Sequence, residues 1–359
     1  LDPLFLFADA PDTPDLAATH YFGPGLHRLP GDGKLTLASG EHVYLAAGAI
    51  VEGRFVLEPG SHDIQIRGRG ILSNGEWPHE SWGVPYLIEH ATFYSKGTHH
   101  FLLEGLTLIH ATGWTVAIED LKGGATHDNR YENLSMVHWA GNSDGIWITG
   151  DRNRVDDCFL FINDDAIVSK GGTGSRVSNV VFWGGIWGHL TLWFNFGRDI
   201  TDLTYEHIDV IGKEGGRNLI WGRKLTRSRN IDLRDITFRD LRVEERKRPT
   251  GLHLSRANPN RLIRLEGKDR VSGLRFEDVS LPDQFEDEGL IGEIVPADQG
   301  GAGVTFQNLR MGGRLILSAA DSHLQFSPAP APAADAAADA AAPAPNVRFL
   351  PSPTRPPAP

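Results

Sequence analysis

Residues 142–148 read Asn-Ser-Asp-Gly-Ile-Trp-Ile, and residues 162–168 read Ile-Asn-Asp-Asp-Ala-Ile-Val. Each stretch is a turn with carboxylates that runs directly into a short apolar strand. Gly145 and Ala166 are 21 residues apart, which is about the length of one coil in a stacked β-solenoid. The two stretches therefore predict two consecutive coils, stacked in register at ~4.8 Å.

A short pattern recurs on both sides of these stretches. It places an Asn, Asp or Gly between apolar residues, at Gly105, Asn133, Asp157, Asn179, Asp202, Asp235, Asp278 and Asn308. Successive members lie 28, 24, 22, 23, 33, 43 and 30 residues apart. β-Branched and aromatic residues alternate between them, with little helical periodicity and without hairpin signals. The sequence thus predicts an all-β chain folded as a right-handed parallel β-helix, rather than a sandwich with hairpin-linked strands.

We predict three segments along the chain. Residues 1–40 form a short N-terminal β segment or cap, and residues 41–326 form the parallel β-helix that carries the catalytic site. Residues 327–359 are rich in Pro and Ala, and they cannot bury enough apolar surface to offset the entropy of ordering. This C-terminal tail is therefore expected to be a linker or a disordered end.

Composition excludes several classes of function. The net charge of −11 over 359 residues argues against nucleic acid as a partner. The single cysteine, Cys158, excludes an internal disulfide, and its inward position predicts a buried side chain. No apolar run approaches the ~18 residues of a membrane span. The chain opens at Leu1 without a leader, so we expect a secreted or periplasmic protein whose leader lies outside this chain. The sequence does not define an oligomeric state.

The carboxylates of the two stretches are the strongest candidates for chemistry. Stacking would place Asp144 over Asp165, with Asp164 beside them. Asp residues often simply end a coil, but three carboxylates in one patch raise the pKa of one of them, so that one stays protonated beside ionised neighbours. Glycoside hydrolysis needs this combination: an acid for the leaving oxygen and a base for the attacking water.

Three motifs resemble those of a known family. Residues 142–145, 164–165 and 188–191 (Gly-His-Leu-Thr) resemble the Asn-Thr-Asp, Asp-Asp and Gly-His-Gly motifs of glycoside hydrolase family 28, the polygalacturonases. They also resemble the β-helix dextranases and isopullulanases of family 49. The opening of the chain, with Tyr-Phe-Gly-Pro-Gly at 21–25, looks more like family 49. The resemblance covers roughly residues 1–320.

The resemblance implies a glycosidase and assigns roles to the three carboxylates. Asp164 would be the general acid, while Asp144 and Asp165 would activate the water, with inversion at the anomeric carbon. Spacing alone leaves both stereochemical outcomes open, since carboxylates on neighbouring coils lie near ~5 Å or beyond ~6.5 Å apart. The implied mechanism uses no cofactor and no metal ion.

One departure from family 28 bears on the substrate. That family has an Arg-Ile-Lys strand that binds the uronate carboxylate, whereas residues 218–221 here read Asn-Leu-Ile-Trp. Without the Arg/Lys pair an acidic sugar loses its charge-assisted partners, so we expect a neutral polysaccharide or oligosaccharide, an α-glucan of the dextran or pullulan type. Arg217, Arg223 and Lys224 lie close enough in sequence to keep pectin open as an alternative.

Further residues are candidates for binding or supporting roles. His189 lies 24 residues after Asp165, so stacking would bring it to the pair and let it tune their protonation. Alternation predicts that Trp147 faces outward, where an indole could pack on a sugar ring. Lys170 is either a contact to a substrate hydroxyl or a solvated surface lysine. The full set of predicted supporting residues is His189, Trp147, Asn142, Lys170, Trp193 and Trp221.

Two other functions remain open at this point. The first is a polysaccharide lyase in which Asp144, Asp164 and Asp165 bind Ca²⁺ and Lys170 or an arginine abstracts a proton. The second is a non-catalytic carbohydrate-binding β-helix in which the acidic residues only end the coils.

Overall fold

The computed structural model describes residues 4–75, 90–120, 125–184, 188–193, 198–211, 218–223, 230–244, 261–265, 269–283, 289–328 and 346–352. The chain forms two compact units, Leu1–Ile167 and Val168–Pro359. Among the described residues the helical structure is limited to the 3₁₀ turn η1 (Ala297–Gln299), and the remaining elements are β-strands. No helix in this described part is long and apolar enough to cross a membrane.

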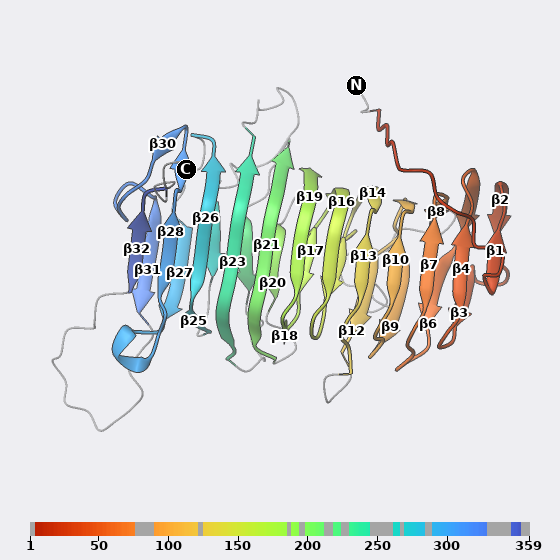
Figure 1. Ribbon diagram of the computed structural model, residues 1–359, viewed down its shortest axis with the longest axis horizontal. Helices are drawn as coiled ribbons and strands as arrows, with labels where there is room; N and C mark the ends of the chain where they lie inside the picture. Colours follow the sequence, from red (N-terminus) through yellow and green to blue (C-terminus); the bar gives the residue numbers. More distant parts are fainter. Residues whose placement is uncertain are drawn as a thin grey trace, which may run out of the picture. The chain divides into compact units, whose positions relative to one another are not determined.

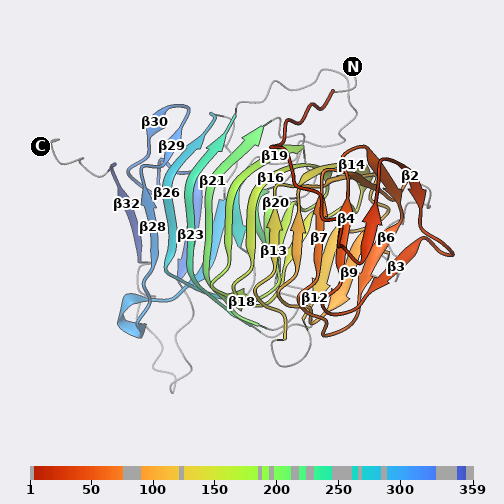
Figure 2. The ribbon, with the colours of Figure 1, turned by 45° about the vertical axis from the view of Figure 1, so that its right-hand side comes forward.

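Three parallel ladders run through the first unit, and successive coils add to each of them (Figures 1 and 2). The first ladder contains β1 (His20–Phe22), β4 (His42–Leu45), β7 (Gln65–Gly68), β10 (Leu102–Glu104), β13 (Arg130–Glu132) and β16 (Arg154–Asn163). The second contains β2 (Gly25–Arg28), β5 (Ala49–Glu52), β8 (Ile71–Ser73), β11 (Thr107–Ile109), β14 (Ser135–Gly141) and the later part of β16. The third contains β3 (Lys34–Leu37), β6 (Arg54–Leu57), β9 (Phe93–Lys96), β12 (Val116–Glu119) and β15 (Ile146–Ile148).

Side chains along these ladders stack in register. Leu103, Tyr131 and Val155 occupy the same position in three successive coils, and each has at most 1% of its surface exposed. Burying one such side chain contributes about 1.5–3 kcal/mol, so a column of them holds consecutive coils together. Cys158 is buried as predicted, and burial raises the pKa of its thiol to about 12.

The recurring Asn, Asp and Gly residues have one conformational cause. All eight, from Gly105 to Asn308, have a positive φ between 50° and 76°. The left-handed region is sterically costly for most L-residues but is tolerated by Asn and Asp and is free for Gly. The pattern therefore marks a bend that lies directly after a strand or within one, once in each coil, which is why it recurs at the coil length.

Two parallel ladders dominate the second unit (Figure 1). The first contains β19 (Arg176–Gly184), β21 (Ile200–Ile211), β23 (Asp232–Val243), β26 (Leu274–Leu281), β28 (Val304–Gln307) and β32 (Val347–Leu350). The second contains β20 (Gly188–Trp193), β22 (Asn218–Arg223), β24 (Arg261–Leu265), β27 (Gly289–Ile294) and β31 (Leu324–Pro328). The shorter strands are β17 (Ile167–Ser169), β18 (Gly172–Thr173), β25 (Arg270–Ser272), β29 (Arg310–Met311) and β30 (Arg314–Leu315).

A column of aromatic rings runs along the first of these ladders. Tyr205, Phe238, Phe276, Phe306 and Phe349 stack successively, with ring centroids 5.1, 5.3, 4.7 and 4.8 Å apart. Offset-stacked rings contribute about 0.5–1.5 kcal/mol beyond their buried area. The stack continues into β32, so the aromatic column reaches the last described strand.

Strands also lie in the N-terminal segment, which the sequence predicts to be β, and in the tail, which it predicts to be a linker or a disordered end. In the segment 1–40, β1, β2 and β3 pair in parallel with β4, β5 and β6, so they form a coil of the β-helix itself. In the Pro/Ala-rich tail, β32 pairs in parallel with β28. Residues 329–345 and 353–359 of that tail lie outside the described residues.

Candidate active site

The two acidic turns stack in the register that their spacing predicts. The N–H of Gly145 donates to the carbonyl of Asp165 at 2.9 Å, and the N–H of Ile146 donates to that of Ala166 at 2.9 Å. This ladder places Asp144 over Asp165, one coil apart, because side chains at matched positions of a parallel ladder lie on the same face.

Gly145 permits this close approach. A Cβ added to it would overlap the carbonyl oxygen of Ala166 and meet Leu160 at 2.9 Å. On the other side, the N–H of Thr115 donates to the carbonyl of Asp144 at 2.8 Å, and that of Val116 donates to Gly145 at 2.9 Å. The acidic turns are therefore held between backbone bonds from both neighbouring coils.

Asp164 is the carboxyl group with the clearest environment. It is 5% exposed; its Oδ2 accepts the N–H of Asn142 at 3.0 Å and its Oδ1 accepts the N–H of Asp165 at 3.0 Å. These bonds favour the ionised form, but burial outweighs them and raises the pKa of Asp164 to about 6. A carboxylic acid with this pKa keeps its proton under mildly acidic conditions and can donate it.

Asp144 is fixed by a tryptophan. It is 5% exposed, and its Oδ2 accepts the indole N–H of Trp147 at 3.2 Å. The ring of Trp147 packs against Trp114 with centroids 4.3 Å apart and planes tilted by 48°. Trp147 is only 2% exposed, so the expectation that it faces outward is wrong. Its role in the described site is to hold Asp144.

Polar contacts also tie the two turns to each other. The buried hydroxyl of Ser143 donates to the carbonyl of Ala140 at 2.7 Å and accepts the N–H of Asn163 at 3.3 Å. The side-chain amide of Asn163 donates to the carbonyl of Trp139 at 2.9 Å. Trp139 itself is 48% exposed and is the exposed tryptophan nearest in sequence to the acidic turns.

Together these contacts place three buried carboxyl groups on two adjacent coils. Asp144, Asp164 and Asp165 are each at most 5% exposed, and Asn142, which donates to Asp164, is buried beside them. Of the three, Asp164 has a pKa that burial raises to about 6. Such oxygens also suit a hard cation, although both oxygens of Asp164 already accept backbone bonds.

The other predicted residues belong to the second unit. Lys170 is 5% exposed, so it is not a solvated surface lysine. Trp221 is half-buried on β22 and pairs with Thr191 of β20. The backbones of His189 and Trp193 lie in β20, while their side chains, like that of Arg223 and the whole of Arg217 and Lys224, lie outside the described residues. Participation of these residues in the site stays a prediction.

Two features of the first unit do not follow from the sequence patterns. The first is the packing of Trp114 on Trp147. The only sign of this contact in the sequence is that Trp114 lies one coil before the acidic turn. In addition, His62, His99, His100 and His127 gather on successive turns of the first unit. The signal for this second group was a histidine repeated at the start of successive coils, with His99 and His100 adjacent.

Comparison with solved structures shows which known folds this chain resembles. No protein-family profile and no curated protein matches the sequence. Among solved structures, the dextranase Dex49A from Penicillium minioluteum shares 17% identity with a TM-score of 0.66, over 86% of this chain and 59% of its own. A family 28 exopolygalacturonase from Yersinia enterocolitica shares 16% identity (TM-score 0.55, 86% and 71%). A polygalacturonase from Erwinia carotovora shares 11% identity (TM-score 0.54, 78% and 82%).

These similarities confirm the predicted fold. All three structures are right-handed parallel β-helices, and the ladders of both units have the same parallel pairing. At identities of 11–17% the likeness establishes the fold alone. The chain spans 59% of the length of the dextranase, so activity and substrate have to be argued from its own residues.

Proposed function

We propose that this protein is a glycoside hydrolase that cleaves a polysaccharide or oligosaccharide with Asp144, Asp164 and Asp165. The observation that carries the proposal is the stacking of three buried carboxyl groups on two coils, one of them with a pKa raised to about 6. A β-helix without a catalytic role would need no buried carboxyl cluster. Exposed Asp residues serve equally well at the bends of its coils, as Asp157 does.

In the proposed mechanism Asp164 is the general acid. Its proton goes to the glycosidic oxygen as the bond from that oxygen to the anomeric carbon breaks. Asp144 and Asp165 take a proton from a water molecule, whose oxygen attacks the anomeric carbon from the opposite face. The indole N–H of Trp147 keeps Asp144 oriented. Proton exchange with solvent then restores Asp164 to its acid form, and the anomeric configuration is inverted.

For the substrate we propose a neutral α-glucan of the dextran or pullulan type. The likeness to a dextranase supports this, as does the net charge of −11, which disfavours an anionic polymer. On β22 the described side chains, Asn218 to Trp221, include no cation. Polygalacturonate is the second candidate, supported by the likeness to two polygalacturonases. A polymer of this kind is met outside the cell, in keeping with a secreted or periplasmic enzyme.

A panel of glycans tests this proposal. Reducing ends are measured after incubation with dextran, pullulan, α-1,3-glucan and polygalacturonate. We expect release from at least one neutral α-glucan and little from polygalacturonate. Proton NMR of the first product should show the β-anomer, since inversion converts an α-linkage to a β-hemiacetal. Release from polygalacturonate alone would move the proposal to pectin, and unsaturated products absorbing in the ultraviolet would replace hydrolysis by elimination.

A further inference from the structure

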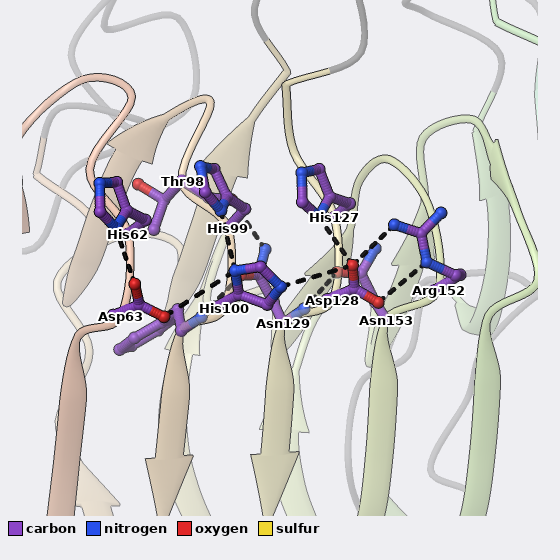
Figure 3. Close-up of polar contacts among 11 residues, drawn as sticks. His62, Asp63, Thr98, His99, His100, His127, Asp128, Asn129, Arg152 and Asn153 are labelled. Carbon is purple, nitrogen blue, oxygen red and sulfur yellow. Dashed lines mark hydrogen bonds and ion pairs between the residues drawn. The ribbon is translucent and has the colours of Figure 1, made fainter. Parts of the chain in front are cut away.

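A row of histidines lies in the turns just before the strands of the first ladder in the first unit. His62 precedes β7, His99 precedes β10 and His127 precedes β13. The rings of His62, His99 and His127 project to the same side from successive coils (Figure 3). Their centroids are 5.1 and 4.6 Å apart, with planes within 17° of parallel. The spacing follows from the ladder, because His62 and His99 form a parallel bridge. The row therefore has the periodicity of the fold.

A fourth imidazole lies beside this row. Asp151 follows His127 in this column through a second parallel bridge. The left-handed position after His62, His99, His127 and Asp151 is occupied in turn by Asp63, His100, Asp128 and Arg152, with φ between 52° and 55°. His100 lies between the two carboxylates (Figure 3), 3.9 Å from Asp63 and 3.8 Å from Asp128. Its Nδ1 is 3.1 Å from Nδ1 of His99. Two tetrahedral Zn²⁺ ligands lie about 3.3 Å apart when each Zn–N bond is about 2.0–2.1 Å, so this nitrogen pair already has nearly the spacing of a chelate.

The neighbouring carboxylate orients the third imidazole. Nδ1 of His127 is 2.7 Å from Oδ2 of Asp128. The guanidinium of Arg152 donates two hydrogen bonds to Asp128, at 2.9 and 2.6 Å, which fix the carboxylate beside the ring. When Nδ1–H of His127 donates to this carboxylate, Nε2 carries the lone pair. This carboxylate–histidine relay is the usual support of a metal-binding imidazole.

The turn that carries His99 and His100 is closed by an internal asparagine. Asn129 accepts the N–H of Phe101 at 3.0 Å, donates to the carbonyl of Thr98 at 3.0 Å, and its own N–H donates to Asn153 at 3.1 Å. The backbone on both sides of the two histidines is thus fixed by buried bonds. Ligands on a fixed backbone lose little entropy when they bind an ion.

From this geometry we infer that His99, His100 and His127 form a binding site for a late first-row divalent metal ion, with Zn²⁺ as the probe. One nitrogen from each of the three lies within 4.8 Å of the others. Coordination at about 2.0–2.1 Å requires the longest nitrogen–nitrogen separation to contract by up to about 1.5 Å, and His100, whose side chain is 50% exposed, can rotate to close it. Imidazole is a preferred ligand of Zn²⁺, Ni²⁺ and Cu²⁺, and water completes the coordination.

The left-handed position suits Asn, Asp, Gly and His, and Asp fills it in the coils on either side of His100, while histidine fills it again at His110, His207 and His323. The backbone therefore tolerates histidine at this position, and it is the geometry of the nitrogen atoms that favours a ligand role. An ion bound across coils would join two turns and stabilise the first unit.

Calorimetric titration of the full, tag-free chain with ZnCl₂ tests the inference. We expect one ion per chain and a rise in Tm with Zn²⁺ that a chelator reverses. His100→Asn keeps a residue suited to positive φ and should weaken binding at least tenfold, as should His127→Gln. The matched control is His62→Gln, which removes an imidazole of the same row outside the three-residue set and should leave the affinity unchanged.

Two results would overturn the inference: wild-type protein that takes up no Zn²⁺, or His62→Gln and His100→Asn losing affinity equally, which would mean diffuse binding along the row. The Tm of each variant without metal checks its folding. Binding is read without any glycan, so the outcome is independent of the proposed hydrolase activity.

Discussion

The carboxyl group of Asp164 sets the chemistry expected at the scale of single residues. It is buried, and each of its oxygens accepts a backbone N–H. Desolvation disfavours the ionised form more than the two hydrogen bonds favour it, and the pKa rises to about 6. A general acid must be protonated when the substrate binds, so this pKa fixes the alkaline limit of activity.

We therefore expect kcat to fall as the pH rises through about 6. The protonated fraction of Asp164 is one half at its pKa and falls to about one tenth near pH 7. Initial rates of reducing-end release from pH 4 to 8 measure this limb, with Tm recorded over the same range to separate loss of catalysis from unfolding. A rate that stays constant from pH 5 to 8 would show that Asp164 does not supply the proton.

The sequence predicts contacts between side chains of neighbouring coils only where the backbone register determines them. Asp144 and Asp165 follow from a 21-residue offset because a parallel ladder aligns matched positions. The orientation of Trp147 did not follow, because the alternation argument assumes a strand with one exposed face. All three residues of β15 are buried, so both of its faces are covered and alternation carries no information about exposure.

At the scale of elements, the contact between consecutive coils depends on Gly145. Gly145→Ala would place a Cβ against the carbonyl of Ala166, and we expect a loss of about 1–3 kcal/mol from overpacking, measured as a lower Tm. Gly141→Ala is the matched control, since no heavy atom lies within 4 Å of its added Cβ. Equal Tm values for the two variants would contradict the close approach of the coils.

Aromatic contacts of Phe349 stabilise β32. Phe349 stacks on Phe306 at 4.8 Å and meets Phe326 edge-on at 6.2 Å, and its neighbour Leu350 is 42% exposed. Because Phe349 is only half-buried, we expect Phe349→Ala to cost about 2 kcal/mol, less than the roughly 3–5 kcal/mol of a fully buried ring. Leu350→Ala should leave Tm within a degree of the wild type. If neither substitution changes Tm, β32 contributes nothing to stability.

At the scale of the whole molecule, the fold was predictable because its bends repeat. The eight Asn, Asp and Gly positions all adopt positive φ. The residue type therefore indicates the left-handed backbone conformation, and the spacing indicates the coil length. β32 was not predictable, since its four residues lie in a Pro/Ala-rich tail and only their partner strand identifies them. The histidine row was also missed, because its members are 37 and 28 residues apart in sequence and meet only through stacking.

The most direct test of the proposed hydrolase compares two Asp→Asn substitutions on the preferred glycan. Asp164→Asn keeps the shape of the side chain but cannot donate the proton, so we expect kcat to fall by about 10²–10⁴-fold. Asp157→Asn, at an exposed bend where φ is 54°, should retain the wild-type rate within about twofold. An Asp164→Asn protein that cleaves at the wild-type rate would contradict the assignment of the three carboxylates as the catalytic site.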